Sequence, residues 1–176
     1  MKPGDHPDFY RLPPPEGRSR ESSIRLDREG RFFHDGQPVQ HPGMARAFAS
    51  WIARHPDDGR FILQNGYDWT YFSVEDTPYF VDGVRSTDAG VELELSDGSV
   101  ELLEPSALDL DESGQLLARV KGGLFQARFK RAAQLGIGEF LTLDEDGRWF
   151  LSTERGPVRV LFTRYRSEAT DGRSSS

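Results

Sequence analysis

A basic group and an aromatic group of side chains are the two features of this sequence that could bind a ligand. The basic group lies in residues 116–129, where Gly122-Gly123 separates two stretches of alternating polar and apolar residues, as in a two-residue hairpin loop. Such a loop places Ala118 opposite Ala127 on an apolar face. The other face carries Arg119, Lys121 and Arg128. Because guanidinium groups donate paired hydrogen bonds to phosphate or carboxylate, this second face is a candidate anion site.

The alternative for these cations is an ion-pair network within the chain. Residues 88–112 contain nine acidic and no basic side chains. If Asp97-Gly98 is the loop of a neighbouring hairpin, Glu94 lies directly opposite Glu101, which is destabilising unless a cation covers the pair. The basic hairpin could supply that cation. The sequence therefore leaves two interpretations open: a lattice of ion pairs or a solvated face on the sheet, and a ligand site.

The aromatic group lies on a second expected hairpin, with Asn65-Gly66 as its loop and Ile62 opposite Trp69. One face of this hairpin and its continuation carries Arg60, Tyr67, Trp69, Tyr71 and Glu75. Three rings, an arginine and a carboxylate could stack a flat ring and hydrogen-bond its edge. The alternative is that the rings are core, buried under a neighbouring helix. A third interpretation makes the same face a docking patch for a protein partner or a second copy of the chain.

Catalytic and metal-binding motifs are weak. His34 beside Asp35 could form a general base oriented by a carboxylate, which makes a hydrolase a further alternative, although neighbours on a strand point to opposite faces. Residues 109–114 begin like a calcium loop, but its twelfth position is Val120 instead of glutamate. The chain has no cysteine, which excludes disulfides, thiolate nucleophiles and Cys-ligated zinc. We expect no catalytic residue, no metal and no cofactor.

Charge and hydropathy restrict the partners. The formal net charge of −7 argues against binding an extended nucleic acid, which requires a basic footprint. No apolar stretch approaches the ~20 residues of a membrane-spanning helix, and none resembles a signal peptide. We therefore expect a cytoplasmic protein that does not enter a membrane.

The pattern of apolar residues predicts an α+β fold that is mostly antiparallel sheet, with two short helices at 42–54 and 129–136. Apolar residues in the first helix recur at helical spacing, and Pro42 suits its first turn. The expected parts of the chain are a flexible N-terminal segment at 1–22, an N-terminal α+β half at 23–84, a C-terminal β-rich half at 85–166 and a disordered tail at 167–176.

Two stretches of the sequence resemble each other. Residues 25–39 read RLDREGRFFHDGQPV and residues 142–158 read TLDEDGRWFLSTERGPV. Both contain Leu-Asp, two further residues, Gly-Arg, an aromatic residue and Phe. This similarity is consistent with a duplicated unit, and equally with two hairpin turns that use the same turn chemistry.

Four stretches together resemble an uncharacterised bacterial family, domain of unknown function 1285. They read IRLDREGRFFHDGQPV at 24–39, MARAFASWI at 44–52, SVEDTPYF at 73–80 and VKGGLFQARF at 120–129. The resemblance implies a duplicated α+β core and a C-terminal half loosely like a pleckstrin-homology fold. It also implies a ligand surface between the halves, for a nucleotide-like molecule in signal transduction. The sequence departs from the family at 64–69, which reads QNGYDW.

These observations together predict a non-catalytic, ligand-binding or regulatory module that recognises a small anionic, nucleotide-like molecule. The expected ligand-binding residues are Arg60, Tyr67, Trp69, Tyr71, Glu75, Arg119, Lys121 and Arg128.

Overall fold

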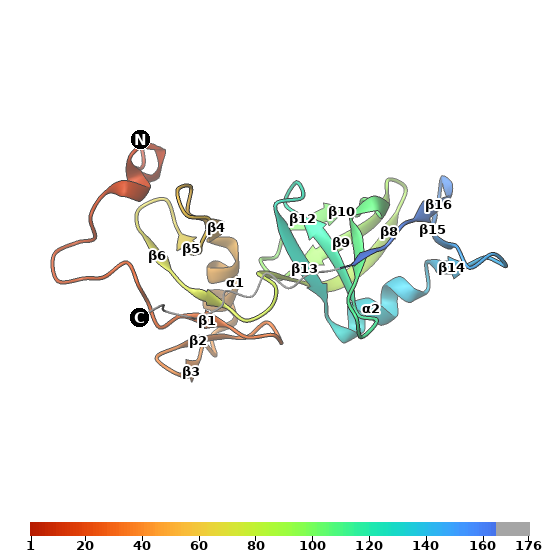
Figure 1. Cartoon of the computed structure of the whole chain (residues 1–176), viewed down its shortest axis with the longest axis horizontal. Helices are drawn as coiled ribbons and strands as arrows, with labels where there is room; N and C mark the ends of the chain where they lie inside the picture. The colour runs from red at the N-terminus through yellow and green to blue at the C-terminus, as the bar shows by residue number, and fades with distance from the viewer. Residues whose placement is uncertain (165–176) are drawn as a thin grey trace. The chain divides into compact units, whose positions relative to one another are not determined.

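The computed structural model describes residues 1–164, which fall into two compact units (Figure 1). The chain passes from the first unit (unit 1) to the second (unit 2) between Asp76 and Thr77. The boundary expected between residues 84 and 85 lies inside the continuous strand β8 (Tyr79–Thr87). The tail predicted at 167–176 lies outside the described residues.

Unit 1 contains two small sheets. The first has the strand order β3 (Gln37–Pro38), β2 (Phe32–His34), β1 (Arg25–Leu26) and β7 (Ser73–Val74). The second consists of β4 (Ile52–Arg54), β5 (Phe61–Gln64) and β6 (Trp69–Tyr71). All pairs in these sheets are antiparallel except β1 with β7.

Helix α1 (Pro42–Ser50) connects the two sheets along the chain and begins at the predicted proline. The ring nitrogen Nδ1 of His41 accepts hydrogen bonds from the backbone N–H groups of Gly43 and Met44, so this histidine is the N-cap. The helix ends four residues earlier than predicted. The reason is that Ile52–Arg54 pairs with β5, which withdraws the backbone from further helical bonding.

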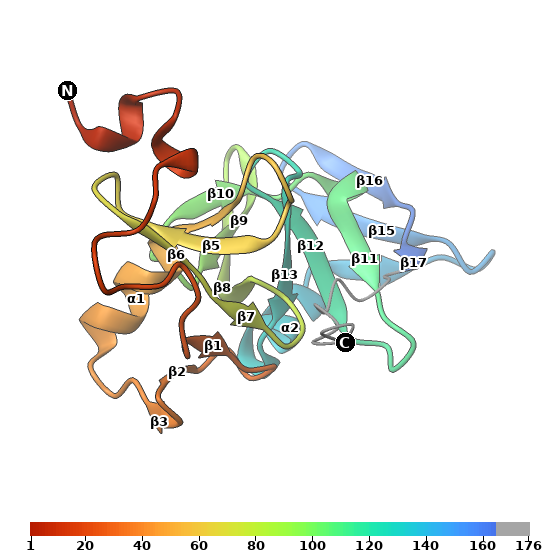
Figure 2. The same ribbon diagram turned by 60° about the vertical axis from the view of Figure 1, so that its left-hand side comes forward.

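The N-terminal segment, expected to be flexible, packs against the second sheet of unit 1. It forms two short 3-10 helices, η1 (Pro3–Asp5) and η2 (Phe9–Arg11). Phe9 is buried with Ile62 and Trp69 in one apolar cluster. Further along, the stretch before β1 runs beside β6, where the N–H of Tyr71 donates to the carbonyl of Arg20 at 2.7 Å (Figure 2).

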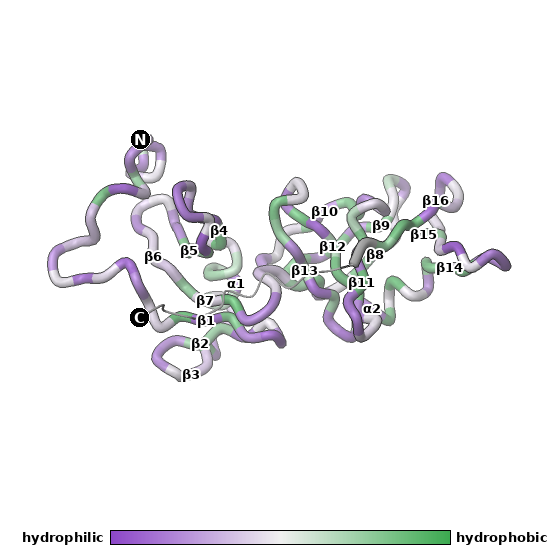
Figure 3. Tube along the Cα trace, in the orientation of Figure 1, coloured by the Kyte–Doolittle hydropathy of each residue, from purple (hydrophilic) through white to green (hydrophobic). Residues whose placement is uncertain are grey.

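Unit 2 is built on a seven-stranded sheet. Its order is β10 (Val100–Leu102), β9 (Gly90–Leu95), β8, β13 (Phe125–Phe129), β12 (Leu116–Val120), β11 (Leu108–Leu110) and β17 (Thr163–Arg164). A separate sheet contains β14 (Leu141–Leu143), β15 (Trp149–Thr153) and β16 (Gly156–Val160). Figure 3 shows hydrophobic and hydrophilic residues alternating along several of these strands.

One face of the large sheet forms the core of unit 2. Helix α2 (Arg131–Gly138) lies so close to β8 that the α-carbon of Gly136 has no room for a side chain beside Val84. A third 3-10 helix, η3 (Pro105–Ala107), precedes β11. With two α-helices and mostly antiparallel strands, the predicted α+β class is confirmed.

The predicted register of the Gly122-Gly123 hairpin is confirmed. Ala118 lies opposite Ala127 and Val120 lies opposite Phe125. The apolar face that follows from this register is buried: Leu116, Ala118, Val120, Phe125, Ala127 and Phe129 all belong to the core.

The Asn65-Gly66 hairpin has a longer loop than predicted. Gln64 lies opposite Trp69, so four residues form the loop instead of two. The cause is the side chain of Asn65, whose Oδ1 accepts the backbone N–H groups of Tyr67 and Asp68, both at 2.9 Å. A shift of two residues changes the opposite partners but leaves Trp69 and Tyr71 on their predicted face, while Tyr67 becomes part of the loop.

The predicted opposition of Glu94 and Glu101 is wrong. Glu94 lies opposite Val100 and Glu101 lies opposite Leu93. The loop has three residues because the N–H of Leu95 donates to the carbonyl of Ser99 at 2.9 Å. This slip of a single residue turns Glu101 to the other face of the sheet.

The similarity between residues 25–39 and 142–158 is explained by a shared turn. Asp27 and Asp144 each accept, through Oδ1, the backbone N–H two residues later at 3.0 Å and the one four residues later at 2.8 Å. The same turn recurs at Asp111, between β11 and β12, with both distances at 2.9 Å. Because the same turn occurs a third time, also with its glycine at positive φ, turn chemistry alone can produce such a resemblance.

Candidate functional site

The predicted basic face of unit 2 is held by acidic partners within the same unit. Lys121 Nζ lies 2.7 Å from Asp97 and 3.5 Å from Glu101, and Glu101 also accepts the backbone N–H of Lys121. The Nη1 of Arg128 donates to Asp111 at 2.6 Å. The ion-pair lattice that was one of the two interpretations of these residues is therefore present.

Two aspartates in this lattice have shifted pKa values. Burial alone would raise the pKa of Asp111, but hydrogen bonds from the Ser113 hydroxyl and from Arg128 outweigh it and lower that pKa to about 2. For Asp97, burial opposes and hydrogen bonds from Lys121 and Ser99 favour the charged form, with a net lowering of its pKa. Both carboxylates are thus ionised partners of the basic face at neutral pH.

Arg119 is less fully engaged than the other two cations. Its Nη2 donates to the carbonyl of Ser106, and its Nε lies 3.7 Å from Asp109. The Nη1 group makes no hydrogen bond to any residue in 1–164, and the side chain is 42% exposed. Arg119 therefore retains donors that can reach a ligand.

Most of the predicted aromatic face in unit 1 is core. Trp69 is 5% exposed, and its Nε1 donates to the carbonyl of Phe9 at 3.3 Å. Tyr71 is half-buried and its hydroxyl donates to Asp58 at 2.7 Å, which together with burial raises the pKa of Tyr71 to about 12. Phe9 and Tyr10 cover this face, so a partner that docks on it must first displace the N-terminal segment.

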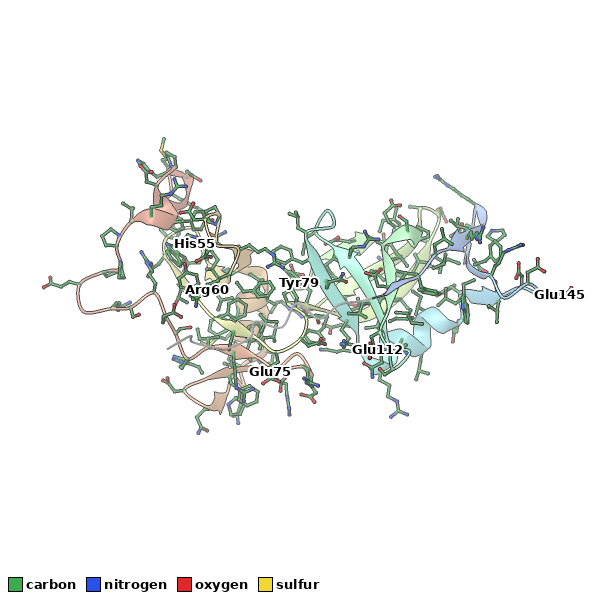
Figure 4. The ribbon with its side chains drawn as sticks, viewed as in Figure 1. His55, Arg60, Glu75, Tyr79, Glu112 and Glu145 are labelled. Carbon is green, nitrogen blue, oxygen red and sulfur yellow. The ribbon has the colours of Figure 1, made fainter. Side chains whose placement is uncertain are left out.

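The remaining predicted residues of unit 1 form ion pairs or lie at the surface. Arg60 (Figure 4) donates to both carboxylate oxygens of Glu21, at 2.8 and 2.9 Å, and stacks on the Tyr71 ring. Glu75 pairs with Arg25 at 2.7 Å. Tyr67 is exposed on the 65–68 loop. The five residues thus do not form one open surface.

A cavity of about 810 Å³ lies elsewhere in unit 1, between the segment before β1 and the strands β2 and β6. Most of its lining residues are of polar type, and the lining consists of Pro15, Arg18, Ser19, Arg20, Glu21, Ser22, Ser23, His34, Asp35, Asp68, Trp69 and Thr70. Trp69 is the only residue of the predicted site in this lining. Half of the lining residues lie within residues 1–22, which were expected to be flexible, so the sequence pattern did not indicate this cavity.

The carboxylates of this cavity already have partners. Glu21 binds Arg60, Asp68 binds Arg20 at 2.6 Å, and Asp35 accepts the hydroxyl of Ser23 at 2.5 Å. Arg18, in contrast, makes no ion pair or side-chain hydrogen bond with any residue in 1–164. Arg18 is therefore the arginine of the wall that has no carboxylate partner among the described residues, and Asp35 is the carboxylate whose partner is a hydroxyl and not an arginine.

A smaller slot of about 150 Å³ shares Asp68, Trp69 and Thr70 with the wall of the cavity. The slot is also lined by Ile24, Phe48, Trp51, Leu63 and Asn65. Phe48 and Trp51 are half-buried and their ring centroids lie 5.7 Å apart. The Oδ1 of Asn65 is occupied by backbone donors, whereas its amide nitrogen makes no hydrogen bond within the described part of the chain. The slot therefore combines aromatic surface with one available polar edge.

The geometry at His34 does not match a hydrolase triad. The Nε2 of His34 lies 3.7 Å from Asp35, and both side chains are exposed. The hydroxyl of Ser23 donates to Asp35 and not to the histidine that would have to take its proton. His34 is thus a wall residue of the cavity without a nucleophile to activate.

The described residues contain neither a candidate metal site nor a candidate membrane-spanning helix. No group of three or more His, Cys, Asp or Glu side chains within residues 1–164 is placed to hold a metal ion. No helix in that range is long and apolar enough to span a membrane.

The fold is similar to that of two solved bacterial proteins. A DUF1285 family protein from Silicibacter pomeroyi DSS-3 matches with a TM-score of 0.64 and 19% identity, over 92% of this chain and 90% of that one. A DUF1285 family protein from Shewanella baltica OS155 matches with a TM-score of 0.51 and 16% identity, over 64% of this chain and 87% of that one. No family model and no curated protein matches the sequence. At the level of the fold, the resemblance to domain of unknown function 1285 is confirmed.

Proposed function

We propose that this chain is a non-catalytic binding module for a small anionic, nucleotide-like ligand, and that the ligand occupies the cavity and the aromatic slot of unit 1. The guanidinium of Arg18 carries this proposal, because it makes no ion pair within residues 1–164 and lies in the wall of a cavity whose carboxylates are all hydrogen-bonded. Sites for small ligands commonly combine a concave surface with a few polar groups of this kind.

The cavity suits the anionic part of such a ligand. Arg18 can donate two parallel hydrogen bonds to a phosphate, and the hydroxyl of Ser19, which accepts the backbone N–H of Glu21, lies in the same wall. Arg20 has a different role. Its Nη1 and Nη2 donate to Asp68 and to backbone carbonyls, so these two groups hold the wall together and are not available to the ligand.

The slot suits a planar ring. Stacking of a base on an aromatic side chain contributes about 1–3 kcal/mol and tolerates different bases. Phe48 and Trp51 supply that surface, and the amide nitrogen of Asn65 can donate to a ring acceptor. A molecule with an aromatic ring joined to an anionic group would therefore use both spaces at once.

The site differs from the one predicted from the sequence, which relied on residues now seen in ion pairs. The regulatory role implied by the family resemblance remains part of the proposal, because a module without catalytic groups acts through what it binds.

Isothermal titration of the full chain with AMP, adenosine and inorganic phosphate tests the proposal. We expect AMP to bind more tightly than either fragment, because only AMP fills both spaces. Arg18→Ala should weaken AMP but not adenosine, and Trp51→Ala should weaken adenosine but not phosphate. Equal affinity of AMP for the wild type and for Arg18→Ala would reject the site.

A further inference from the structure

A cavity of about 390 Å³ in unit 2 has a composition that the proposed function does not use. It is lined by Leu93, Glu101, Leu102, Leu103, Glu104, Ser106, Ala107, Arg119, Val120, Gly122 and Gly123. Unlike the cavity of unit 1, it has an aliphatic floor, and its wall also carries charged groups of both signs. Its volume lies within the range common for sites that hold small molecules.

The floor is formed by side chains that belong to the core of unit 2. Leu93, Leu103 and Val120 are all buried, and the partly exposed Leu102 stands at the rim. None of the lining residues is aromatic. An aliphatic side chain of a ligand can therefore be removed from water here, whereas a stacked ring finds no partner.

Two charged groups of the wall keep unused hydrogen-bonding capacity. The carboxylate of Glu104 makes no hydrogen bond or ion pair with any residue in 1–164, and Glu104 is exposed. The Nη1 of Arg119 is likewise unoccupied, while Nε and Nη2 are fixed by Asp109 and Ser106. The cavity thus offers one acceptor with a negative charge and one oriented donor with a positive charge.

The third charged group of the wall is already satisfied. Glu101 accepts the backbone N–H of Lys121 at 2.9 Å and lies 3.5 Å from its Nζ. This bond also holds Lys121 at φ +55°, a conformation that non-glycine residues rarely adopt, next to the glycines of the cavity wall. Glu101 therefore maintains the wall and leaves Glu104 and Arg119 for a ligand.

We propose that this cavity binds a small zwitterion with an aliphatic side chain, of the class of free branched-chain α-amino acids. The ammonium group would meet Glu104, the carboxylate would meet the Nη1 of Arg119, and the side chain would lie on Leu93, Leu103 and Val120. An anion alone would leave Glu104 unpaired, and an amine alone would leave Arg119 unpaired. The zwitterion matches both.

The test compares ligands that lack one charge. Two-dimensional NMR of the full chain is recorded with L-leucine, L-leucinamide and N-acetyl-L-leucine at up to about 10 mM, which saturates a millimolar site. We expect L-leucine to shift the backbone amides of residues 101–104, 106–107 and 119–124. We expect each derivative to bind about tenfold more weakly, because each loses one charge-assisted hydrogen bond.

Two glutamate variants distinguish a loss of this binding site from a general effect on the fold. Glu104→Gln should weaken L-leucine about tenfold, and Glu112→Gln, an exposed glutamate outside the cavity, should not weaken it. Arg119→Lys should weaken binding as well, because lysine cannot reproduce the fixed orientation of Nη1. Absence of shifts with L-leucine, equal binding of L-leucinamide, or unchanged binding by Glu104→Gln would each overturn the proposal.

This test is independent of the nucleotide proposal. The two cavities share no residue, and neither Glu104→Gln nor Arg119→Lys touches the wall of the cavity in unit 1. Binding of AMP by Glu104→Gln should therefore equal that of the wild type, so either proposal can fail alone.

Discussion

The guanidinium of Arg20 lies over the ring of Trp69, with 4.4 Å between Cζ and the ring centroid, and its Nη1 donates to the carbonyl of the same residue at 2.8 Å. Its Nη2 donates to the carbonyls of Leu12 and Pro13, in the N-terminal segment. One side chain thus ties that segment to the start of β6. The N-terminal segment and β6 both flank the cavity of unit 1, so the shape of the cavity depends on the contacts of Arg20.

Arg20→Ala should therefore destabilise unit 1. Arg20 is 16% exposed at its side chain, and its loss leaves three backbone carbonyls and Asp68 without this donor. We expect a decrease of about 3 kcal/mol in the free energy of unfolding, measured by urea denaturation with tryptophan fluorescence. Arg18→Ala is the control and should leave the denaturation midpoint unchanged. Equal effects of the two variants would contradict the assigned roles.

A pair of glycines in α2 tests the packing of the helix on β8. A β-carbon on Gly136 would lie 2.8 Å from Cγ2 of Val84, whereas one on Gly138 would meet nothing within 4 Å. Gly136→Ala should cost about 1–2 kcal/mol through overpacking. Gly138→Ala should be neutral or slightly stabilising. Thermal denaturation of both variants gives the comparison, and a stabilised Gly136→Ala would show that the helix lies further from the strand.

The pKa of Asp111 makes a prediction about acid stability. Its value of about 2 in the folded protein lies below the value of ~3.9 expected in the unfolded chain, so ionised Asp111 stabilises the fold above about pH 4. That contribution is lost as the pH falls from about 4 to about 2. At pH 7, Asp111→Asn should be less stable by at most about 2 kcal/mol.

The same variant should lose less stability than the wild type on acidification, because it has no carboxylate to protonate at this position. Urea denaturation at several pH values between about 2 and 7 measures this difference. Glu112→Gln, the neighbouring exposed residue, serves as the control and should follow the wild type. A difference between wild type and Asp111→Asn that is constant across this range would contradict the lowered pKa.

The shared turns should differ in their sensitivity to loss of the aspartate. Asp27 is 5% exposed at its side chain, whereas Asp144 is 32% exposed. Asp27→Ala removes a buried acceptor from partly buried hydrogen bonds, whereas water can replace the more exposed Asp144 more easily. The backbone amides of Arg31 and Arg148 donate to these aspartates, so their hydrogen-exchange rates measure the stability of each turn separately. We expect the larger acceleration at Arg31, and an equal acceleration would refute the role of burial.

How much of the fold the sequence predicts depends on what forms each turn. The register at Gly122-Gly123 follows from backbone geometry alone and is confirmed. At Asn65 and near Asp97, side chains accept backbone N–H groups and lengthen the loops, by two residues and by one. Of these two changes in register, only the one-residue shift near Asp97 moves side chains to the other face of the sheet. Patterns of alternation do not encode these side-chain bonds.

The candidate site was harder to predict, for a different reason. The alternation of arginine and serine in residues 18–23 is the signal that could have indicated the cavity, but its proline-rich surroundings suggest a flexible segment. What fixes this segment is the burial of Phe9 against Ile62 and Trp69, a contact between residues far apart in the sequence. The partners of Arg128 and Lys121 are likewise set by strand order, which composition does not reveal.

The affinity of the full chain for AMP, compared between the wild type, Arg18→Ala and Arg46→Ala by isothermal titration calorimetry, tests the central claim most directly. Arg46 is an exposed arginine on α1, outside the cavity, and controls for a general loss of positive charge. The account predicts that Arg18→Ala weakens AMP at least about tenfold, as expected for a lost bidentate contact, while Arg46→Ala binds like the wild type. Equal weakening by both variants, or no binding by the wild type, would contradict it.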